Sequence, residues 1–314
     1  MHVPMNLLSD STILIAGAGG GFDFLCGLPL AYELEAQGHR VIFSSYSFTD
    51  LKSVDCESLK DRLYKITSLS LLRNGTYFPE GFFAKWYLTK NKKEIPVYCY
   101  NNVGVLTLTE YFNTISSLHK INAVIVIDGG VDGIFRGDEY GLGTPSIDSI
   151  SMIAANECNI KEKYYVMTGF GSEGVGDEVS HAEVLQRISD LVKNNTYFGV
   201  TALLKNCGAA NCFIDAAEYI FGRMPAHQHS NIVCSILKSI SGEFGFNAVN
   251  TKTEINPIWI SALTSMYWIF DLNGAAKMKL FYNKALKTDT VQEISKLIEN
   301  YRGNAAKLRM TIPL

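Results

Sequence analysis

Short runs of apolar residues along the chain predict four buried strands, which cover residues 12–16, 40–45, 122–127 and 163–167. Uninterrupted apolar runs of this length are typical of strands that are covered on both faces in a parallel sheet. Between the first two runs, residues 29–38 carry apolar side chains at helical spacing and end at a glycine. Glycine is common where a helix ends, so this part of the chain predicts a strand–helix–strand unit.

Helical spacing of apolar residues continues in the later parts of the chain. Strands and helices that alternate in this way are typical of α/β proteins. We therefore expect a Rossmann-like, doubly wound and mostly parallel sheet with a helical C-terminal third. The further predicted helices cover residues 106–119, 146–155, 180–193, 209–221, 230–240 and 288–302.

Residues 1–314 are interpreted as a single α/β domain, because neither a linker nor an internal repeat divides the chain. Residues 46–100 contain many aromatic side chains without a clear period, which predicts an irregular excursion over one mouth of the sheet. Residues 205–314 are mainly helical in pattern, and we expect them to pack on the same core.

The charge and cysteine patterns restrict the possible partners and location. The formal net charge is −3, the isoelectric point is near 6.1, and the most basic run is Lys90 to Lys93. A nucleic acid or an anionic membrane is therefore not an expected partner, because both are bound through basic faces. The seven cysteines include no C-x-x-C pair, which predicts free thiols. With no signal peptide pattern and no long apolar span, these features predict a cytoplasmic protein, while export by a specialised secretion system is left open.

Three of the predicted strands run into glycine-rich loops, at residues 17–23, 128–145 and 168–174. The carboxyl ends of parallel strands meet at one edge of a sheet, so the three loops are expected to form one ligand site at the switch point. The predicted ligand-binding residues are Gly17, Gly19, Gly20, Gly21, Phe22, Asp23, Gly129, Gly130, Arg136, Thr144, Gly169, Gly171, Ser172 and Glu173.

The first loop matches a dinucleotide-binding fingerprint only in part. Gly17 and Gly19 supply its first two glycines, but Phe22 stands where the third is expected. The second strand ends in residues 44–46, Ser-Ser-Tyr, which offer no carboxylate for a ribose hydroxyl. Asp23 is interpreted in two ways: it stabilises the start of a helix, or it binds hydroxyls or a bridging cation at the edge of an anion site.

The second loop contains a group of acidic residues, Asp128, Asp132, Asp138 and Glu139, which are the candidate catalytic residues. Carboxylates held close together raise one another's pKa or share a metal ion. Asp128, Asp132 and Asp138 are therefore candidate ligands for Mg²⁺ or Ca²⁺, and Arg136 is a candidate anion partner. The alternative is a solvated acidic loop in which Asp and Gly residues make turns.

Several segments match the pattern of a known family: residues 17–23, 128–132, 137–139, 143–149 and 168–174, with later features at 267–272 and 298–302. Together they resemble a family of bacterial and archaeal proteins that is catalogued as a domain of unknown function. The resemblance implies that the three glycine loops belong to one site in a Rossmann-like fold, and it implies no particular activity. In the third loop, residues 171–173 read Gly-Ser-Glu where a run like Asp-Gly-Glu is expected.

These observations predict a hydrolase that acts on a nucleotide or nucleoside derivative, either free or carried on a protein. A ribosyl bond, as in ADP-ribose, is preferred over a phosphoester, because acidic groups suit an oxocarbenium-like transition state. The cation-rich clamp that favours phosphoryl transfer is missing. The alternatives are a non-catalytic nucleotide-binding sensor and an NAD(P)-dependent oxidoreductase, and a homo-oligomer is compatible with the sequence.

Overall fold

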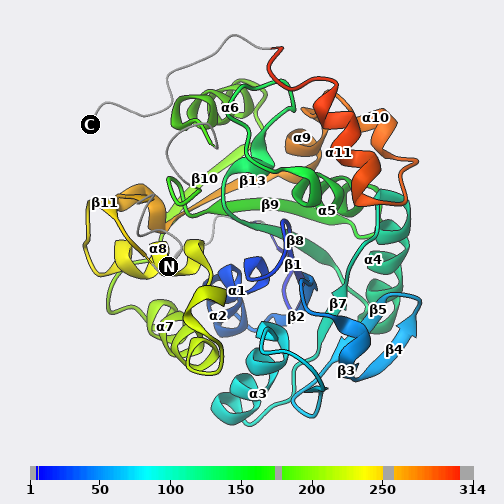
Figure 1. Ribbon diagram of the computed structural model, residues 1–314, viewed down its shortest axis with the longest axis vertical. Coiled ribbons are helices and arrows are strands. Elements are labelled where there is room, and N and C mark those ends of the chain that lie inside the picture. The colour runs from blue at the N-terminus through cyan, green and yellow to red at the C-terminus, as the bar shows by residue number, and fades with distance from the viewer. Residues whose placement is uncertain (1–4, 6, 174–178, 250–257, 305–314) are drawn as a thin grey trace.

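The computed structural model describes residues 5, 7–173, 179–249 and 258–304. Its main sheet has nine strands: β1 (Thr12–Gly17), β2 (Arg40–Tyr46), β4 (Glu57–Lys60), β5 (Leu63–Ile66), β7 (Val97–Tyr100), β8 (Ala123–Gly129), β9 (Glu162–Thr168), β10 (Tyr197–Ala202) and β13 (Met266–Asp271). Their order across the sheet is β10-β13-β9-β8-β1-β2-β7-β5-β4 (Figure 1). Strands β9, β8, β1, β2 and β7 are parallel neighbours, which confirms the predicted doubly wound, mostly parallel sheet.

Helices cover both faces of this sheet. The described helices are α1 (Asp23–Cys26), α2 (Leu28–Ala36), α3 (Pro79–Asn91), α4 (Val105–His119), α5 (Ser146–Glu157), α6 (His181–Lys193), α7 (Gly208–Phe221), α8 (Asn231–Ile240), α9 (Leu272–Lys277), α10 (Tyr282–Ala285) and α11 (Val291–Glu299). The helices that the sequence predicts are all found, most of them within a few residues of the expected bounds. The chain forms them where apolar residues recur at a helical period and face the sheet.

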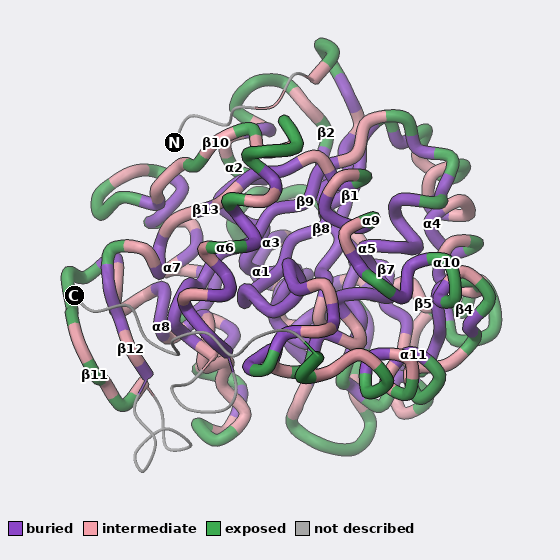
Figure 2. Tube along the Cα trace, turned by 90° about the horizontal axis from the view of Figure 1, so that it is seen from above, coloured by how far each residue is buried: buried purple, intermediate pink, exposed green. Residues whose placement is uncertain are grey.

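The two faces have separate cores because side chains alternate along each strand. On β1, Leu14 and Ala16 pack with α4, α5 and the helices α9 to α11. Ile13 and Ile15 point the other way and pack with α1, α2, α3, α7 and α8. The buried parts of the trace accordingly gather in the central strands and the inner turns of the helices (Figure 2).

The switch point of the sheet lies between β1 and β8. The chain passes from β1 through β2 to β7 on one side, and then returns to place β8 on the other side of β1. Connections that leave neighbouring parallel strands in opposite directions open a crevice at their carboxyl ends. The first and second glycine loops both begin at this crevice.

The structure changes the expectation for residues 46–100. This segment contains β7, a fully buried strand that pairs in parallel with β2, together with α3 and the antiparallel strands β4 and β5. Residues 97–100 are too few to show a period, so their role as a strand depends on packing against β2. Two short strands, β3 (Val54–Asp55) and β6 (Leu71–Leu72), pair beside them.

The C-terminal third is largely helical, and it also completes the sheet. Strand β13 inserts antiparallel between β9 and β10, and a separate hairpin is formed by β11 (Gly245–Asn247) and β12 (Ile258–Ile260). Tyr267 on β13 is fully buried, as expected for a core residue. No described helix is long and apolar enough to cross a membrane.

Candidate functional site

A cavity of about 220 Å³ opens at the carboxyl edge of the sheet, between β1 and β8. Segments from six parts of the chain meet there: the first glycine loop, the segment after β2, the second loop, the start of α5, the third loop and the start of α8. The lining residues are Gly19, Gly20, Asp23, Phe48, Asp128, Gly129, Asp132, Thr144, Ile147, Asp148, Glu173 and Ile232. Five of them carry carboxyl groups, so the cavity is strongly acidic.

The amides of the first glycine turn are used within the protein. The N–H of Gly19 donates to Oδ2 of Asp23 at 2.6 Å, and the N–H of Gly21 donates to the carbonyl of Tyr46 at 3.0 Å. Gly20 and Gly21 have positive φ angles, which glycine adopts readily. The turn therefore directs a backbone donor at its own aspartate, in the place where dinucleotide-binding turns hold a phosphate.

Three residues predicted to bind ligand in this loop do not line the cavity. A Cβ on Gly17 would lie 2.8 Å from the backbone nitrogen of Phe24, so glycine lets strand and helix pack closely. Phe22 is buried against Tyr77 and Phe221, and neither it nor Gly17 or Gly21 lines the cavity.

Asp23 is a buried acid with a shifted titration. Burial raises its pKa to about 7, although the backbone amides of Gly19, Gly129 and Gly20 favour its charged form. A Cβ on Gly129 would lie 2.7 Å from Oδ1 of Asp23, so a side chain at this position would displace the carboxylate.

Asp128 is the second-last residue of strand β8 and is 1% exposed. Its Oδ2 accepts hydrogen bonds from the hydroxyl of Tyr165 at 2.7 Å and from the N–H of Gly133 at 3.1 Å. Burial, followed by the charges of Asp132 and Asp23, raises the pKa of Asp128 well above its usual value. The two donors leave the other oxygen, Oδ1, available to the cavity.

Asp132 and Glu173 form a hydrogen-bonded pair of carboxyl groups across the cavity. The N–H of Thr144 donates to Asp132 at 2.9 Å, and the N–H of Val131 donates to Glu173 at 2.6 Å. Burial and then the charge of Asp132 raise the pKa of Glu173 well above its usual value. Burial also raises the pKa of Asp132, but the bonds from Thr144 and Glu173 favour its charged form.

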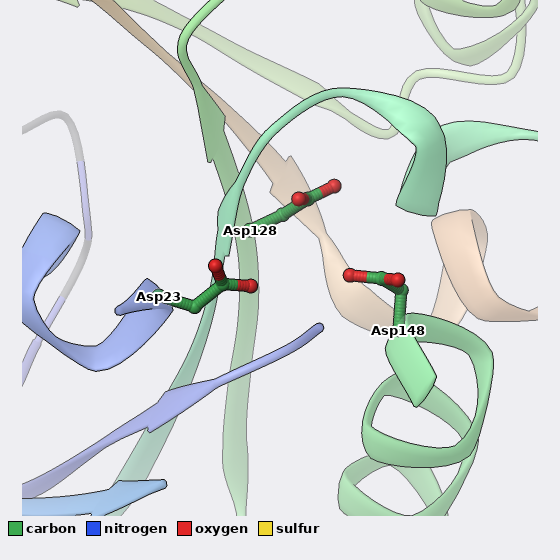
Figure 3. A group of neighbouring side chains, drawn as sticks. All are labelled: Asp23, Asp128 and Asp148. Atoms are coloured by element: carbon green, nitrogen blue, oxygen red, sulfur yellow. The ribbon is translucent and has the colours of Figure 1, made fainter. Parts of the chain in front are cut away.

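Asp148 belongs to the site and was missed by the sequence analysis. It lies in the first turn of α5, where an acidic residue is normally interpreted as a partner of the helix dipole. In the structure it is 4% exposed, and burial and three neighbouring aspartates raise its pKa well above the usual value. Asp23, Asp128 and Asp148 each offer a carboxylate oxygen, and these oxygens lie within 4.8 Å of one another (Figure 3). Asp148 lies in the segment 143–149, which resembles the family pattern, but only the fold brings its side chain to the cavity.

The structure does not bring Arg136, Asp138 and Glu139 to the cavity. Arg136 pairs with Asp138 at 2.9 Å. Glu139 is buried, accepts the N–H groups of Arg136 and Gly137 at 2.9 Å each, and lies 3.6 Å from Arg187. The predicted catalytic roles of Asp138 and Glu139, the metal-ligand role of Asp138 and the anion-binding role of Arg136 thus lose their geometric basis. The physical reason is the turn at Gly137, whose φ of +108° leads this part of the loop toward α6.

The third loop positions Glu173 by means of its glycines. Gly169 and Gly171 have positive φ angles, and Ser172 is buried with its hydroxyl bonded to the carbonyl of Gly169. A Cβ on Gly130 would lie 2.8 Å from Oε1 of Glu173, so only glycine leaves room for this carboxyl group. These four residues shape the site and do not line the cavity.

A second cavity of about 450 Å³ adjoins the acidic one and shares Phe48 and Ile147 with it. It lies at the carboxyl ends of β2 and β7, and its other lining residues are Tyr46, Ser47, Thr49, Asp50, Asn101, Asn102, Val291 and Gln292. Hydroxyl and amide groups dominate this lining. Phe48 is 60% exposed, so an aromatic face is presented at the boundary between the two cavities.

No lysine, arginine or histidine lines either cavity within the described ranges. The buried Lys279 lies behind the second loop, where its Nζ donates to the carbonyls of Gly133 and Phe135 at 2.8 and 3.1 Å. Burial lowers the pKa of Lys279 to about 8, against the opposite effect of Asp148 and other carboxylates. This lysine holds the loop in place and is not among the residues that line the cavity.

Comparison with known proteins gives a family and no activity. The family described as "Protein of unknown function (DUF1152)" matches residues 14–305. No curated protein matches the chain, and no solved structure does so either. The matched range includes all three glycine loops and every carboxylate of the cavity. The chain therefore belongs to the DUF1152 family.

Proposed function

We propose that this protein is a hydrolase that cleaves a ribosyl bond in a nucleotide or nucleoside derivative. The observation that carries the proposal is the hydrogen-bonded pair of Asp132 and Glu173, which lies beside Asp128 in the switch-point cavity. Two neighbouring carboxyl groups with raised pKa values can serve as the acid and the base of a hydrolysis.

The two members of the pair divide the work. Glu173 holds a proton and gives it to the leaving group as the bond from C1 of the ribose breaks. After the leaving group has departed, water enters from the same side, its oxygen bonds to C1, and Asp132 takes its proton. The hydrogen bond between the two carboxyl groups offers a route by which that proton returns to Glu173. The charged carboxylates around them stabilise the positive charge that develops on the ribosyl ring.

Two features support a ribosyl bond over a phosphoester. The N–H of Gly19 in the glycine turn donates to Asp23, so this donor is not free for a phosphate oxygen. The lining side chains described for the two cavities include no cation, whereas phosphoryl transfer needs positive charge around the transferred group.

The adjoining cavity supports a nucleotide-like substrate. Ligands of doubly wound sheets bind across the crevice at the carboxyl ends of the strands. The exposed ring of Phe48 offers a stacking surface, and the side-chain amides of Asn102 and Gln292 match the donor and acceptor groups of a base edge. The oxidoreductase alternative gains no such support, because Glu80, the carboxylate that bonds Ser45 at the end of β2, is fully buried.

The test is a product screen with labelled water. The full-length protein is incubated with NAD, ADP-ribose, nucleosides and an ADP-ribosylated peptide in H₂¹⁸O, and products are identified by mass spectrometry. We expect a product with a free ribose C1 hydroxyl and no label on phosphate, and we expect Glu173→Gln to lower turnover at least about 100-fold while ligand binding persists. Asp138→Asn is the matched control, because its pair with Arg136 lies outside the cavity. Binding without any product contradicts the proposal and favours the nucleotide sensor, and label on phosphate favours phosphoester hydrolysis.

A further inference from the structure

Three aspartates from separate parts of the chain direct their carboxyl groups at one point. Asp23 follows β1, Asp128 is the second-last residue of β8, and Asp148 begins α5; all three are at least nine-tenths buried. Each offers one oxygen, and these oxygens lie within 4.8 Å of one another. Figure 3 shows the three side chains pointing toward one another from α1, β8 and α5. Like charges gathered in a buried space repel, and either protons or a bound cation relieves this repulsion.

Asp148 gives the second, independent sign of a ligand. Asp23 has a donor in the N–H of Gly19, and Asp128 has donors in Tyr165 and Gly133. No described residue donates a hydrogen bond to Asp148, although this side chain is 4% exposed and faces the cavity. A buried carboxylate without a donor costs on the order of several kcal/mol unless it takes up a proton or a cation binds it.

The protein supplies only part of the compensating positive charge, through the electrostatic effect of Lys279 on Asp148 and its neighbours. The buried cation nearby, Lys279, directs its Nζ at the carbonyls of Gly133 and Phe135. No ion pair between a described basic side chain and Asp23, Asp128 or Asp148 is formed. The neighbouring glycine Gly19, where a Cβ would lie 2.6 Å from Oδ1 of Asp148 and 2.9 Å from Oδ2 of Asp23, keeps the space between the carboxylates open.

We propose that Asp23, Asp128 and Asp148 bind a hard divalent cation of the Mg²⁺ or Ca²⁺ class. Such ions prefer carboxylate oxygens at about 2.0–2.6 Å, which brings ligand oxygens to within about 3–5 Å of one another, as found here. Three protein ligands leave coordination positions for water and for the hydroxyl groups of a ribose. This cation site deepens the proposed function and depends on it only for the identity of the substrate. The bound ion would hold a ribosyl group beside Asp132 and Glu173.

This ligand set differs from the one that the sequence predicted. Asp128 is common to both, Asp23 and Asp148 are new as a set, and Asp138 is replaced. Asp132 stays in the cavity but gives one oxygen to the N–H of Thr144 and bonds Glu173. It is therefore assigned to proton transfer and not to the ion.

The test uses full-length protein treated with EDTA and then dialysed. Mg²⁺ and Ca²⁺ are titrated separately by calorimetry, and thermal unfolding is followed with each ion and with NaCl at equal ionic strength. We expect one of the two ions to bind at a single site and to raise the melting temperature where NaCl does not. The ion that binds more tightly identifies the size of the site.

Variants separate a built site from general acidity. Asp148→Asn is expected to weaken ion binding at least about tenfold and to leave the melting temperature in EDTA unchanged or higher. Asp23→Asn, on another element, is expected to lose affinity to the same extent, so the test does not depend on one variant. Asp138→Asn binds the ion as the wild type does.

Wild-type protein without an ion-specific shift, or equal binding by Asp148→Asn and Asp138→Asn, overturns the cation site. Its failure is distinguishable from that of the proposed function. Ribosyl hydrolysis by a wild-type protein that shows no ion-specific binding contradicts only the cation site. Ion binding without hydrolysis of any ribosyl substrate contradicts only the hydrolase.

Discussion

The backbone N–H of Gly19 donates a 2.6 Å hydrogen bond to the carboxylate of Asp23, four residues further along the chain. A glycine turn at the end of the first strand usually presents such an amide to a phosphate. Here the protein fills the position with its own anion. The turn therefore contributes negative charge to the crevice. A dinucleotide-binding turn, whose sequence it partly resembles, has the opposite electrostatic effect.

This relationship predicts how the turn responds when its anion is removed. In EDTA, Asp23→Ala is expected to bind pyrophosphate at least about tenfold more tightly than the wild type, because the Gly19 amide becomes free and one negative charge is lost. Calorimetric titration measures the change. Asp128→Ala is the matched control, since it removes a carboxylate from the cavity and leaves the bond between Gly19 and Asp23 intact. Equal gains in the two variants would show that net charge alone controls anion binding.

The group of Arg136, Asp138 and Glu139 is expected to affect stability and not turnover. Glu139→Ala leaves the buried Arg187 without one of its acidic partners and removes the acceptor of two backbone N–H groups, so we expect a loss of about 3–5 kcal/mol in the free energy of unfolding. Asp138→Asn is expected to keep turnover within about twofold of the wild type, since Asp138 pairs with the partly exposed Arg136. Urea unfolding and steady-state rates test both. A loss of turnover in Asp138→Asn at unchanged stability would return that residue to the site.

Gly133→Ala tests the position of Asp128. A Cβ at this position would lie 2.5 Å from Oδ2 of Asp128 and 3.0 Å from the hydroxyl of Tyr165, so the carboxylate has to move. A displacement of about 1 Å lowers turnover on the order of 100-fold in a preorganised site, and we expect this loss with a correctly folded protein. Circular dichroism establishes the fold, and the ribosyl hydrolysis assay gives the rate. Unchanged turnover would contradict a direct role for Asp128.

Glu80 predicts a pH dependence of stability that is separate from the acidic cavity. Burial raises the pKa of Glu80 above its ordinary 4.5, although hydroxyls such as that of Ser45 lower it in part. The folded state therefore binds this proton more tightly than the unfolded state does. The free energy of unfolding falls as the pH rises from the ordinary pKa of a glutamate to the raised pKa of Glu80. Glu80→Gln is expected to remove this part of the slope, measured by urea unfolding from about pH 4.5 to about pH 8. Glu110→Gln, exposed on α4, is the control for the loss of one acidic group, and an equal change in both variants would contradict the interpretation.

The sequence determined the frame of the fold, because that frame depends on local periods. Apolar runs and helical spacing located β1, β2, β8 and β9 with their helices, and glycine loops after three of these strands indicated one ligand edge. Strand β7 is not predicted by these patterns. Its four residues show no period, and their burial comes from pairing with β2.

The sequence also determined part of the acidic site. Four acidic residues lie at or shortly after the carboxyl ends of parallel strands, where the topology brings side chains together. They are Asp23, Asp128, Asp132 and Glu173. Only the tertiary structure decided that Asp148 joins them, and that Asp138 and Glu139 do not. The direction of a loop carboxylate depends on the turn before it and on donors from distant segments. Gly137 and Arg187 draw Glu139 away from the crevice, whereas the start of α5 brings Asp148 into it without a donor of its own.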